Sequence, residues 1–359
     1  MNESYKKNVM WHRITKLFCT FAAKMSMMTV MKQLAVAIAV LLMAACGNTK
    51  QSTSETTTKT EPVGPSFSAD SAYQYCQRQC DFGPRTMNSE AHEQCGAWIA
   101  QQFRQRGLQV TLQQAGLRGY DGTTLKSTNI IAAYRPELSK RILLCAHWDS
   151  RPWADNDPDE ANHRRPVMAA NDGASGVAVM LELARLLATD SIAIGVDFVC
   201  FDAEDWGTPQ WAETNGNDGD TWALGAQYWA EQQAQTQAND YRYGILLDMV
   251  GGQGALFYQE QVSVYYAPEV VKKVWAAAQT VGFGSYFPKE EGDAITDDHV
   301  PVNRTAKIPC IDIIPHYPDC EASSFGPTWH TVSDDMNHID RNTLQAVGQT
   351  LVQVLYSEK

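Results

Sequence analysis

The stretch Val196–Gly207 constrains the fold of this chain more than any other. Its first half, Val196–Phe201, is apolar at most positions and rich in β-branched and aromatic residues, which is typical of a buried strand in a mostly parallel sheet. The stretch then changes to the acidic residues Asp202, Glu204 and Asp205. Ligands bind at the carboxyl ends of strands in open α/β sheets, and neighbouring acids that lose water need a proton, a cation or a metal to neutralise them. This strand end therefore predicts a binding site, with a solvated acidic turn as the alternative.

Segments with the patterns of strands and helices alternate along the rest of the chain. The predicted strands are 108–112, 125–134, 141–147, 196–201, 243–248 and 307–314, and the predicted helices are 70–80, 88–106, 173–188, 221–237, 268–281 and 341–356. Strands that alternate with helices of this length indicate an α/β fold with a single doubly wound sheet, mixed but mostly parallel, with helices on both faces. Asp70 and Asp172 stand where they can cap the first and the third of these helices.

The acidic balance of the chain argues against a nucleic-acid partner. The 359 residues carry a formal net charge of -12, whereas phosphate binding needs clustered Lys and Arg. The hydrophobic content of 44% is ordinary for a globular protein, and the length is sufficient for one large α/β domain. We therefore expect no nucleic acid among its partners.

Residues 1–46 are typical of an export leader. Lys32 precedes a short apolar run, Leu34–Met43, and small residues follow directly before Cys46. The run is short for a membrane span, and a Cys after small residues resembles the bacterial lipobox, in which the Cys is lipidated and becomes the first residue of the mature protein. A transmembrane anchor or a plain signal peptide is the alternative.

Met31 stands at the natural start of this leader, so we expect that residues 1–30 are not translated. After the leader, residues 47–69 are rich in Ser, Thr, Lys, Glu and Pro and predict a flexible tether. Residues 70–359 then form the folded domain. The sequence thus predicts an exported bacterial lipoprotein that is anchored to a membrane through Cys46 and faces the periplasm.

Seven cysteines follow the leader. Cys145 and Cys200 lie in strand-like runs, which favours buried thiols. Disulfide pairing among the others is compatible with an oxidising compartment, but sequence does not assign it: Cys76, Cys80, Cys95, Cys310 and Cys320.

Residues of the kinds that bind metals stand at several predicted strand ends and turns. His147 ends a strand, Asp172 lies in a Gly-rich turn, Asp248 follows another strand, and His330 lies far downstream between Trp329 and Thr331. Taken singly, Asp172 fits a helix cap, His147 a core histidine and His330 a loop residue. Together with Glu204 and Asp205 at one rim of the sheet, they form a donor set that suits zinc.

These motifs resemble those of known enzymes. The broader set resembles the zinc aminopeptidase superfamily of co-catalytic zinc exopeptidases: His147-x-Asp149, Asp172–Gly176, Phe201–Asp205 and His330. A narrower set resembles the animal-type zinc glutaminyl cyclases, which share that fold: Thr296–Pro301, Trp329–Thr331 and Leu247–Gly251. The resemblance covers roughly residues 70–357 and implies an aminopeptidase-like α/β fold.

The resemblance also implies a function. Glutaminyl cyclases convert the N-terminal glutamine of peptides and proteins to pyroglutamate and release ammonia, so peptides that begin with Gln would be the substrates. One zinc per chain is expected. The implied roles, by residue, are zinc ligands Asp172, Asp205 and His330, general acid/base Glu204, and an acidic hydrogen-bonded relay of Asp248 and Asp297.

Aromatic residues are the expected walls of a substrate pocket. The resemblance implies this role for Trp329. Trp206 and Trp148 are further candidates, with packing in the core as their alternative role, because aromatic residues are common in cores. Two positions depart from the animal enzymes, which usually carry Glu at Asp205 and His at Asp312. The first departure shortens a metal ligand, and the second changes the charge of a surrounding network.

Two other functions remain open at the level of sequence. In a dizinc aminopeptidase, His147 and Asp248 would bind a second zinc, Asp172 would bridge the two ions, and Glu204 would activate water. The chain retains all of these residues, so the ligand inventory alone does not exclude this reading. A binding module without activity is the third reading, and the retention of Glu204 argues against it.

Overall fold

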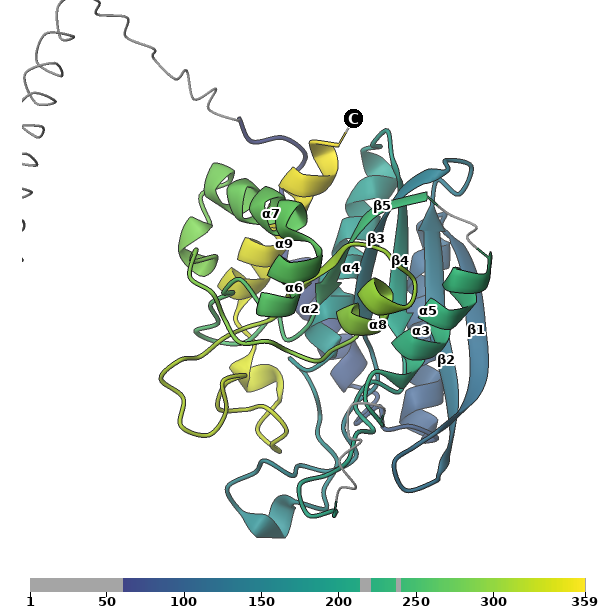
Figure 1. Cartoon of the computed structure of the whole chain (residues 1–359), viewed down its shortest axis with the longest axis vertical. Coiled ribbons are helices and arrows are strands. Elements are labelled where there is room, and N and C mark those ends of the chain that lie inside the picture. The colour runs from purple at the N-terminus through teal and green to yellow at the C-terminus, as the bar shows by residue number, and fades with distance from the viewer. Residues whose placement is uncertain (1–60, 214–220, 237–239, 359) are drawn as a thin grey trace, which may run out of the picture. The chain divides into compact units, whose positions relative to one another are not determined.

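The structure is a computed structural model, and it describes residues 61–213, 221–236 and 240–358. Its strands are β1 (Gln109–Arg118), β2 (Thr124–Tyr134), β3 (Lys140–His147), β4 (Gly195–Phe201), β5 (Asp240–Leu247) and β6 (Cys310–Ile313). They form one six-stranded sheet in the order β1-β2-β4-β3-β5-β6 (Figure 1). β4, β3, β5 and β6 pair in parallel, whereas β2 pairs antiparallel with β1 and with β4. The prediction of a mixed, mostly parallel α/β sheet is confirmed.

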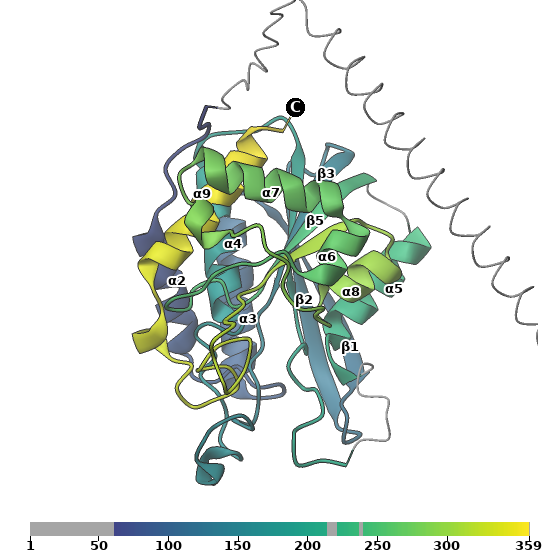
Figure 2. The ribbon, with the colours of Figure 1, turned by 60° about the vertical axis from the view of Figure 1, so that its left-hand side comes forward.

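Helices cover both faces of this sheet. They are α2 (Ala69–Cys80), α3 (Glu90–Gln105), α4 (Ala174–Thr189), α5 (Leu224–Thr236), α6 (Gln261–Tyr266), α7 (Pro268–Thr280), α8 (His299–Arg304) and α9 (Arg341–Tyr356). α2, α3, α4 and α9 lie on one side of the strands, and α5 and α8 lie on the other (Figure 2). The predicted doubly wound arrangement is therefore confirmed as well.

The central strands supply apolar side chains to a core on each face. Along β3, Ile142 and Leu144 belong to the core that α4 and α9 cover, whereas Leu143 and Cys145 belong to the core beneath α5. Alternate side chains of a strand point to opposite faces, so a strand buried on both faces is apolar throughout. This is why Ile142–Ala146 of β3 and most of β4 are apolar in the sequence, while the buried Asp197 of β4 pairs with Arg141 of β3.

Local signals set most helix ends. Ser68 and Ser89 are the N-caps of α2 and α3, and each hydroxyl accepts a backbone N–H from the first turn. Pro268 opens α7 at a position where no N–H is needed. The predicted cap at Asp70 is wrong, because this residue lies within the first turn of α2. There its negative charge interacts favourably with the helix dipole.

Several boundaries differ from the sequence-based ones. β1 continues to Arg118, well beyond the predicted end at 112, because it pairs with β2 along its whole length. The segment 307–314 contains only the four-residue strand β6, and the helix predicted from 221 begins at Leu224. α6 and α8 were not predicted, since six residues are too few to show a helical period.

The end of the predicted tether belongs to the folded body. Phe67 is only 4% exposed and packs against Gly348 of α9. The N–H groups of Val63 and Phe67 donate to Gln353 Oε1 at 2.7 Å and Gln349 Oε1 at 2.9 Å. The folded part therefore begins before residue 70. The leader 1–46, with Cys46, and the tether up to residue 60 lie outside the described residues.

The cysteines of the described residues are free. Cys145 and Cys200 are buried, as their strand positions predict, and no disulfide forms among the seven cysteines of the described segments. Within these segments, no helix has the length and apolarity needed to cross a membrane.

Candidate active site and metal centre

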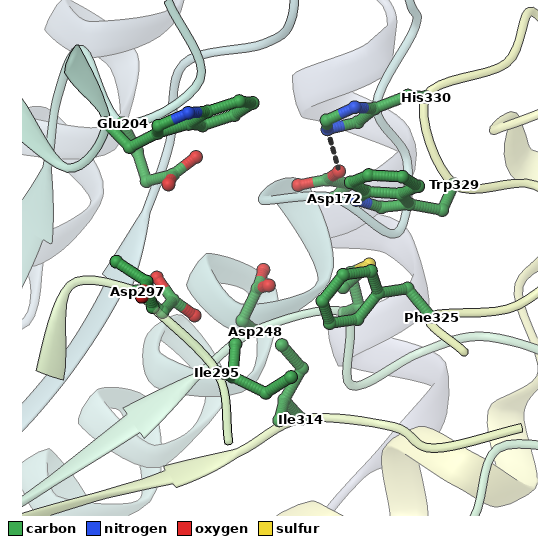
Figure 3. A pocket seen from close by; sticks show the side chains of 12 residues that line it. Asp172, Glu204, Asp248, Ile295, Asp297, Ile314, Phe325, Trp329 and His330 are labelled. Atoms are coloured by element: carbon green, nitrogen blue, oxygen red, sulfur yellow. Dashed lines mark ion pairs between the residues drawn. The ribbon is translucent and has the colours of Figure 1, made fainter. Parts of the chain in front are cut away.

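A cavity of about 290 Å³ opens at the carboxyl ends of the parallel strands. Its lining combines acidic, aromatic and aliphatic side chains: Asp172, Glu204, Trp222, Asp248, Met249, Ile295, Thr296, Asp297, Ile314, Phe325, Trp329 and His330. Figure 3 shows the carboxylates of Glu204, Asp172 and Asp248 directed toward its centre, with Trp329 and Phe325 along one side. The acids that follow β4 and β5 therefore meet in one cavity, as their positions at strand ends predict.

Left-handed backbone at several non-glycine residues shapes the loops around the cavity. Ala169 (φ 56°), Ala203 (φ 54°), Met249 (φ 50°) and His330 (φ 55°) all adopt it. Such conformations are costly for residues with a Cβ and persist only where the surroundings enforce them. Ala203 lies directly before Glu204, so the sharp turn after β4 aims that carboxylate into the cavity.

The Gly-rich turn before α4 brings Asp172 to the same place. A Cβ at Gly173 would lie 2.6 Å from the carbonyl oxygen of His147, and one at Gly176 would lie 2.2 Å from that of Leu247. Only glycine allows α4 to begin so close to the ends of β3 and β5. The N-cap of α4 is Gly173 and has no side-chain cap, so the predicted capping role of Asp172 is wrong and its carboxylate is free to face the cavity.

Asp172, Asp205 and His330 form a compact group of possible metal ligands. One donor atom from each lies within 4.8 Å of the others, and all three side chains are buried. His330 Nε2 lies 3.2 Å from Asp205 Oδ1 and 3.6 Å from Asp172 Oδ2. Within the described part of the chain, Asp205 Oδ2 has no hydrogen-bond partner. Two carboxylates and an imidazole, with a buried oxygen left open, fit a zinc ion.

The surroundings of this group favour the protonation states in which Asp205 and His330 can bind a metal. Burial opposes ionisation of Asp205, but His330 and Arg151 lower the pKa of its carboxyl to about 2. Burial and Arg151 lower the pKa of His330, which keeps the imidazole neutral. Burial and the charge of Asp205 raise the pKa of Asp172 well above its usual range. A divalent cation would remove that repulsion, so the acids and the metal stabilise each other.

Two further buried carboxylates hold the ligand-bearing turns. Asp334 accepts the N–H groups of Asn171 at 2.8 Å and Asp172 at 3.0 Å. Asp149 accepts the N–H groups of Glu204 at 3.1 Å and Asp205 at 3.2 Å. Because each carboxylate binds two successive amides, it fixes the direction of the side chains that follow.

A second possible metal group shares Asp172. His147 Nε2 lies 2.9 Å from Asp172 Oδ1 and 3.2 Å from Asp248 Oδ1, and the three form another buried set within 4.8 Å. Burial opposes protonation of His147, but Asp149, Asp172 and Asp248 raise the pKa of its imidazole well above the usual value. The sequence-based alternative of a second metal at His147 and Asp248 is thus geometrically possible.

Glu204 and Asp297 are acids with perturbed proton affinity in the same cavity. Glu204 is 9% exposed, and burial together with the charge of Asp205 raises the pKa of its carboxyl well above the usual value. Burial and the charge of Asp248 raise the pKa of Asp297 to about 6. Carboxyl groups with raised pKa values can take up and return protons near neutral pH.

The aromatic walls differ in part from those predicted. The ring of Trp329 stacks on His330 at 3.8 Å between centroids and lines the cavity, as the resemblance implies. Trp222 lines it too, parallel to the His330 ring at 6.0 Å. Trp148 and Trp206 are not among the lining residues. Trp148 is buried against His92 at 4.2 Å, and Trp206 packs edge-on against Trp153.

The residues that sequence reasoning missed are mostly apolar. They are Trp222, Met249, Ile295, Ile314 and Phe325. Ile314 directly follows β6 and Met249 is the second residue after β5, so their positions at strand ends were a usable signal. The others lie on loops whose course the sequence does not reveal.

Comparisons with known proteins agree with this geometry. The pattern of Peptidase family M28 matches residues 129–355. The structure of Bacteroides thetaiotaomicron glutaminyl cyclase bound to N-acetylhistamine is 52% identical, with a TM-score of 0.80, and the match covers 83% of this chain and all of that one (100%). The structure of a leucine aminopeptidase precursor from the same species is 51% identical, with a TM-score of 0.79 and the same coverage of 83% and 100%.

A curated relative points to the same family. Aminopeptidase YwaD of Bacillus subtilis is 27% identical over 244 residues, which are 65% of this chain and 45% of that protein. The chain thus spans about half the length of this relative.

We expect Asp334→Ala to weaken zinc binding by about 10- to 100-fold, because the amides of Asn171 and Asp172 lose their shared acceptor and the ligand turn loosens. Competition with a chromophoric chelator measures this affinity. Asp335→Ala is the matched control, since that neighbouring carboxylate is partly exposed and pairs with His338. Equal zinc affinities of Asp334→Ala and Asp335→Ala would show that Asp334 does not position the turn that carries Asp172.

Proposed function

This chain belongs to peptidase family M28, and from that membership and its site we propose that it is a zinc-dependent glutaminyl cyclase with one zinc per chain. Its substrates are peptides and proteins that begin with Gln, which it converts to pyroglutamate with release of ammonia. One observation carries this proposal: Glu204, Asp248 and Asp297 line the same aromatic-walled cavity as Asp172 and His330. The glutaminyl cyclase that is 52% identical over its whole length supports it further.

The reaction is an intramolecular transfer. The α-amine of the substrate attacks its own side-chain amide carbon, so one C–N bond forms and the bond to the amide nitrogen breaks. A zinc ion at Asp172, Asp205 and His330 would act as a Lewis acid on the amide oxygen. The nucleophile and its target belong to one residue, and a cavity that holds the folded rotamer therefore supplies much of the acceleration.

Glu204 is placed to carry the proton. The attacking amine must lose a proton and the departing nitrogen must gain one, so a single carboxyl group can take the first and deliver the second. Burial and Asp205 raise the pKa of Glu204, which brings its proton affinity closer to that of the groups it serves. Asp248 and Asp297 adjoin it in the cavity and form the acidic relay of this proposal.

The aromatic and aliphatic walls hold the substrate side chain. Trp329 and Trp222 lie beside His330, and Phe325, Ile295 and Ile314 complete the apolar lining. The methylene groups of glutamine fit such walls, while its amide faces the acids. The walls also keep bulk water from competing with the amine.

A dizinc aminopeptidase is the second candidate. The complete group of His147, Asp172 and Asp248 favours it, as does the 51% identical leucine aminopeptidase precursor. Under this candidate those residues hold a second zinc, and Glu204 acts on water instead of the substrate amine.

A comparison of two peptides tests the choice. We expect a Gln-initiated peptide to lose one ammonia and keep its full sequence, and a Leu-initiated peptide of the same length to remain unchanged, as mass spectrometry would show. Metal analysis of the same sample should give one zinc per chain. Shortening of the Leu-peptide with two tightly bound zincs would instead identify an aminopeptidase.

We expect Glu204→Gln to keep zinc and to lose about 10²- to 10⁴-fold in kcat, because it removes the proton carrier and no metal ligand. Elemental analysis and a coupled ammonia assay measure the two effects. Glu290→Gln, at an exposed carboxylate, is the control and should match the wild type. Unchanged turnover in Glu204→Gln would exclude the role.

We also propose that the protein is an exported lipoprotein, anchored to a membrane through Cys46 and facing the periplasm. The support is the leader sequence, with its short apolar run and small residues before Cys46. In the native host we expect Cys46→Ser to abolish fatty-acid labelling of the protein. The variant should then be found either in the soluble fraction or as the longer precursor whose leader is not removed, as cell fractionation would show. Fatty-acid labelling that persists in Cys46→Ser would contradict the proposal.

A further inference from the structure

Behind the cavity lies a second group of buried titratable residues. Asp312 of β6 is at its centre and has no exposed surface. Asp297 and Asp298 precede α8, His299 is its first residue, and Glu260 is the N-cap of α6. None of these side chains is more than 5% exposed. Asp297 alone of this group lines the cavity. It therefore connects the cavity wall with the buried acids behind it.

The carboxylate of Asp312 is poorly satisfied if it is ionised. Within the described part of the chain neither of its oxygens has a hydrogen-bond partner, and the nearest imidazole nitrogen, His299 Nδ1, lies 3.9 Å away. Its backbone N–H is bound by Ser263 Oγ at 2.9 Å. A buried, unpaired carboxylate is costly enough that it takes up a proton or binds a cation.

If Asp312 is protonated, Asp297 is the group placed to accept a hydrogen bond from it. One carboxylate oxygen of Asp312 and one of Asp297 lie within 4.8 Å of each other, and Asp297 Oδ2 has no hydrogen-bond partner among the described residues. Two carboxyl groups can share a hydrogen bond only when one is protonated. Asp297 also accepts the N–H of Asp298, which favours its ionised form. The proton therefore belongs on Asp312.

We propose that Asp312 is a protonated positioning residue whose O–H donates to Asp297 and fixes that carboxylate in the wall of the cavity. The inference rests on the proposed function only where it predicts an effect on activity. It also explains how this chain tolerates an acid at the centre of an acidic group, because the protonated acid is a neutral donor.

The surrounding charges support this assignment. Burial, then Asp297, Asp248 and Glu260, raise the pKa of Asp312 well above its usual range. These acids lie before α8, after β5 and at the start of α6, and Asp298 belongs to the same group. His299 is the imidazole of this group, and its Nε2 faces Glu260 Oε2 at 3.3 Å, closer than its Nδ1 lies to Asp312 Oδ2 at 3.9 Å. Burial raises the pKa of Glu260, but the contact with His299 and the donors from Ile295 and Ser263 outweigh it and lower that pKa to about 2, so this acid stays ionised.

The sign of the pH effect follows from linkage. The folded state holds a proton on Asp312 that the unfolded chain releases above a pH of about 4. Wild-type stability therefore falls as the pH rises from that value toward the folded pKa. A neutral side chain at 312 removes this loss.

Two variants at 312 test the proposal. Asp312→Asn keeps a neutral donor, and Asp312→Leu keeps the branched shape, in a larger side chain, without a donor. Relative to the wild type, we expect the Tm of Asp312→Asn to gain about 3 °C or more between pH 5.5 and pH 8.5. Its kcat/KM on a Gln-peptide should stay within about threefold of the wild type, whereas Asp312→Leu should fall by about tenfold or more, with the acidic limb of its pH profile moved to higher pH because Asp297 loses its donor.

Asp319→Asn, at an exposed carboxylate, is the control and should change neither Tm nor kcat/KM. A Tm difference between Asp312→Asn and the wild type that is constant with pH would overturn the proposal. So would a kcat/KM of Asp312→Asn as low as that of Asp312→Leu. Loss of a bound divalent metal from Asp312→Asn would show instead that Asp297, His299 and Asp312 bind a cation. The Tm readout needs no substrate, so it decides the state of Asp312 even if the enzyme is not a cyclase.

Discussion

Keeping several carboxylates out of water at the ends of the parallel strands is the constraint on which the rest of this structure depends. Asp172, Asp205, Glu204 and Asp248 are each at most 9% exposed around one cavity. An isolated buried charge costs several kcal/mol, so each acid needs a compensating group. Arg151, which lies 3.4 Å from Asp205 Oδ1, supplies one positive charge. The remaining negative charge is compensated by protons, by histidines and by the metal binding that the family and the donor set support.

Hydrogen bonds within the protein position these acids. Asp149 and Asp334 bind pairs of backbone N–H groups and so set the two turns that carry Glu204, Asp205 and Asp172. Each of these carboxylates is satisfied by amides and has no need of a metal. The strained left-handed residues beside the turns are stable only because such contacts enforce them. The directions of these side chains are thus set by contacts within the fold.

The sequence predicted the features that follow from strand ends and missed those that follow from loops. Acids after Phe201 and Leu247 converge because parallel strands end at one edge of the sheet. Adjacency to a site residue was a poor guide for aromatic side chains: Trp148 follows His147, but successive side chains near a strand end point in different directions, and its ring packs on His92 instead. Trp222 reaches His330 only through the course of a loop. The role of Asp172 as a cap failed because Gly173 takes that position.

His147 decides how one arrangement of residues can serve two kinds of reaction. Its Nε2 contacts both Asp172 and Asp248, so either a proton on His147 or a metal ion can neutralise these two acids. The same contacts raise the pKa of the imidazole well above its usual value, and an imidazolium repels a second metal. Hydrolysis needs an activated water and benefits from the second ion. Cyclisation uses an amine that the substrate itself supplies, so the proposed cyclase needs no second metal ion at His147. The proposed one-metal cyclase and the two-metal peptidase that is its alternative therefore differ at His147, which would carry a proton in the first and bind a metal ion in the second.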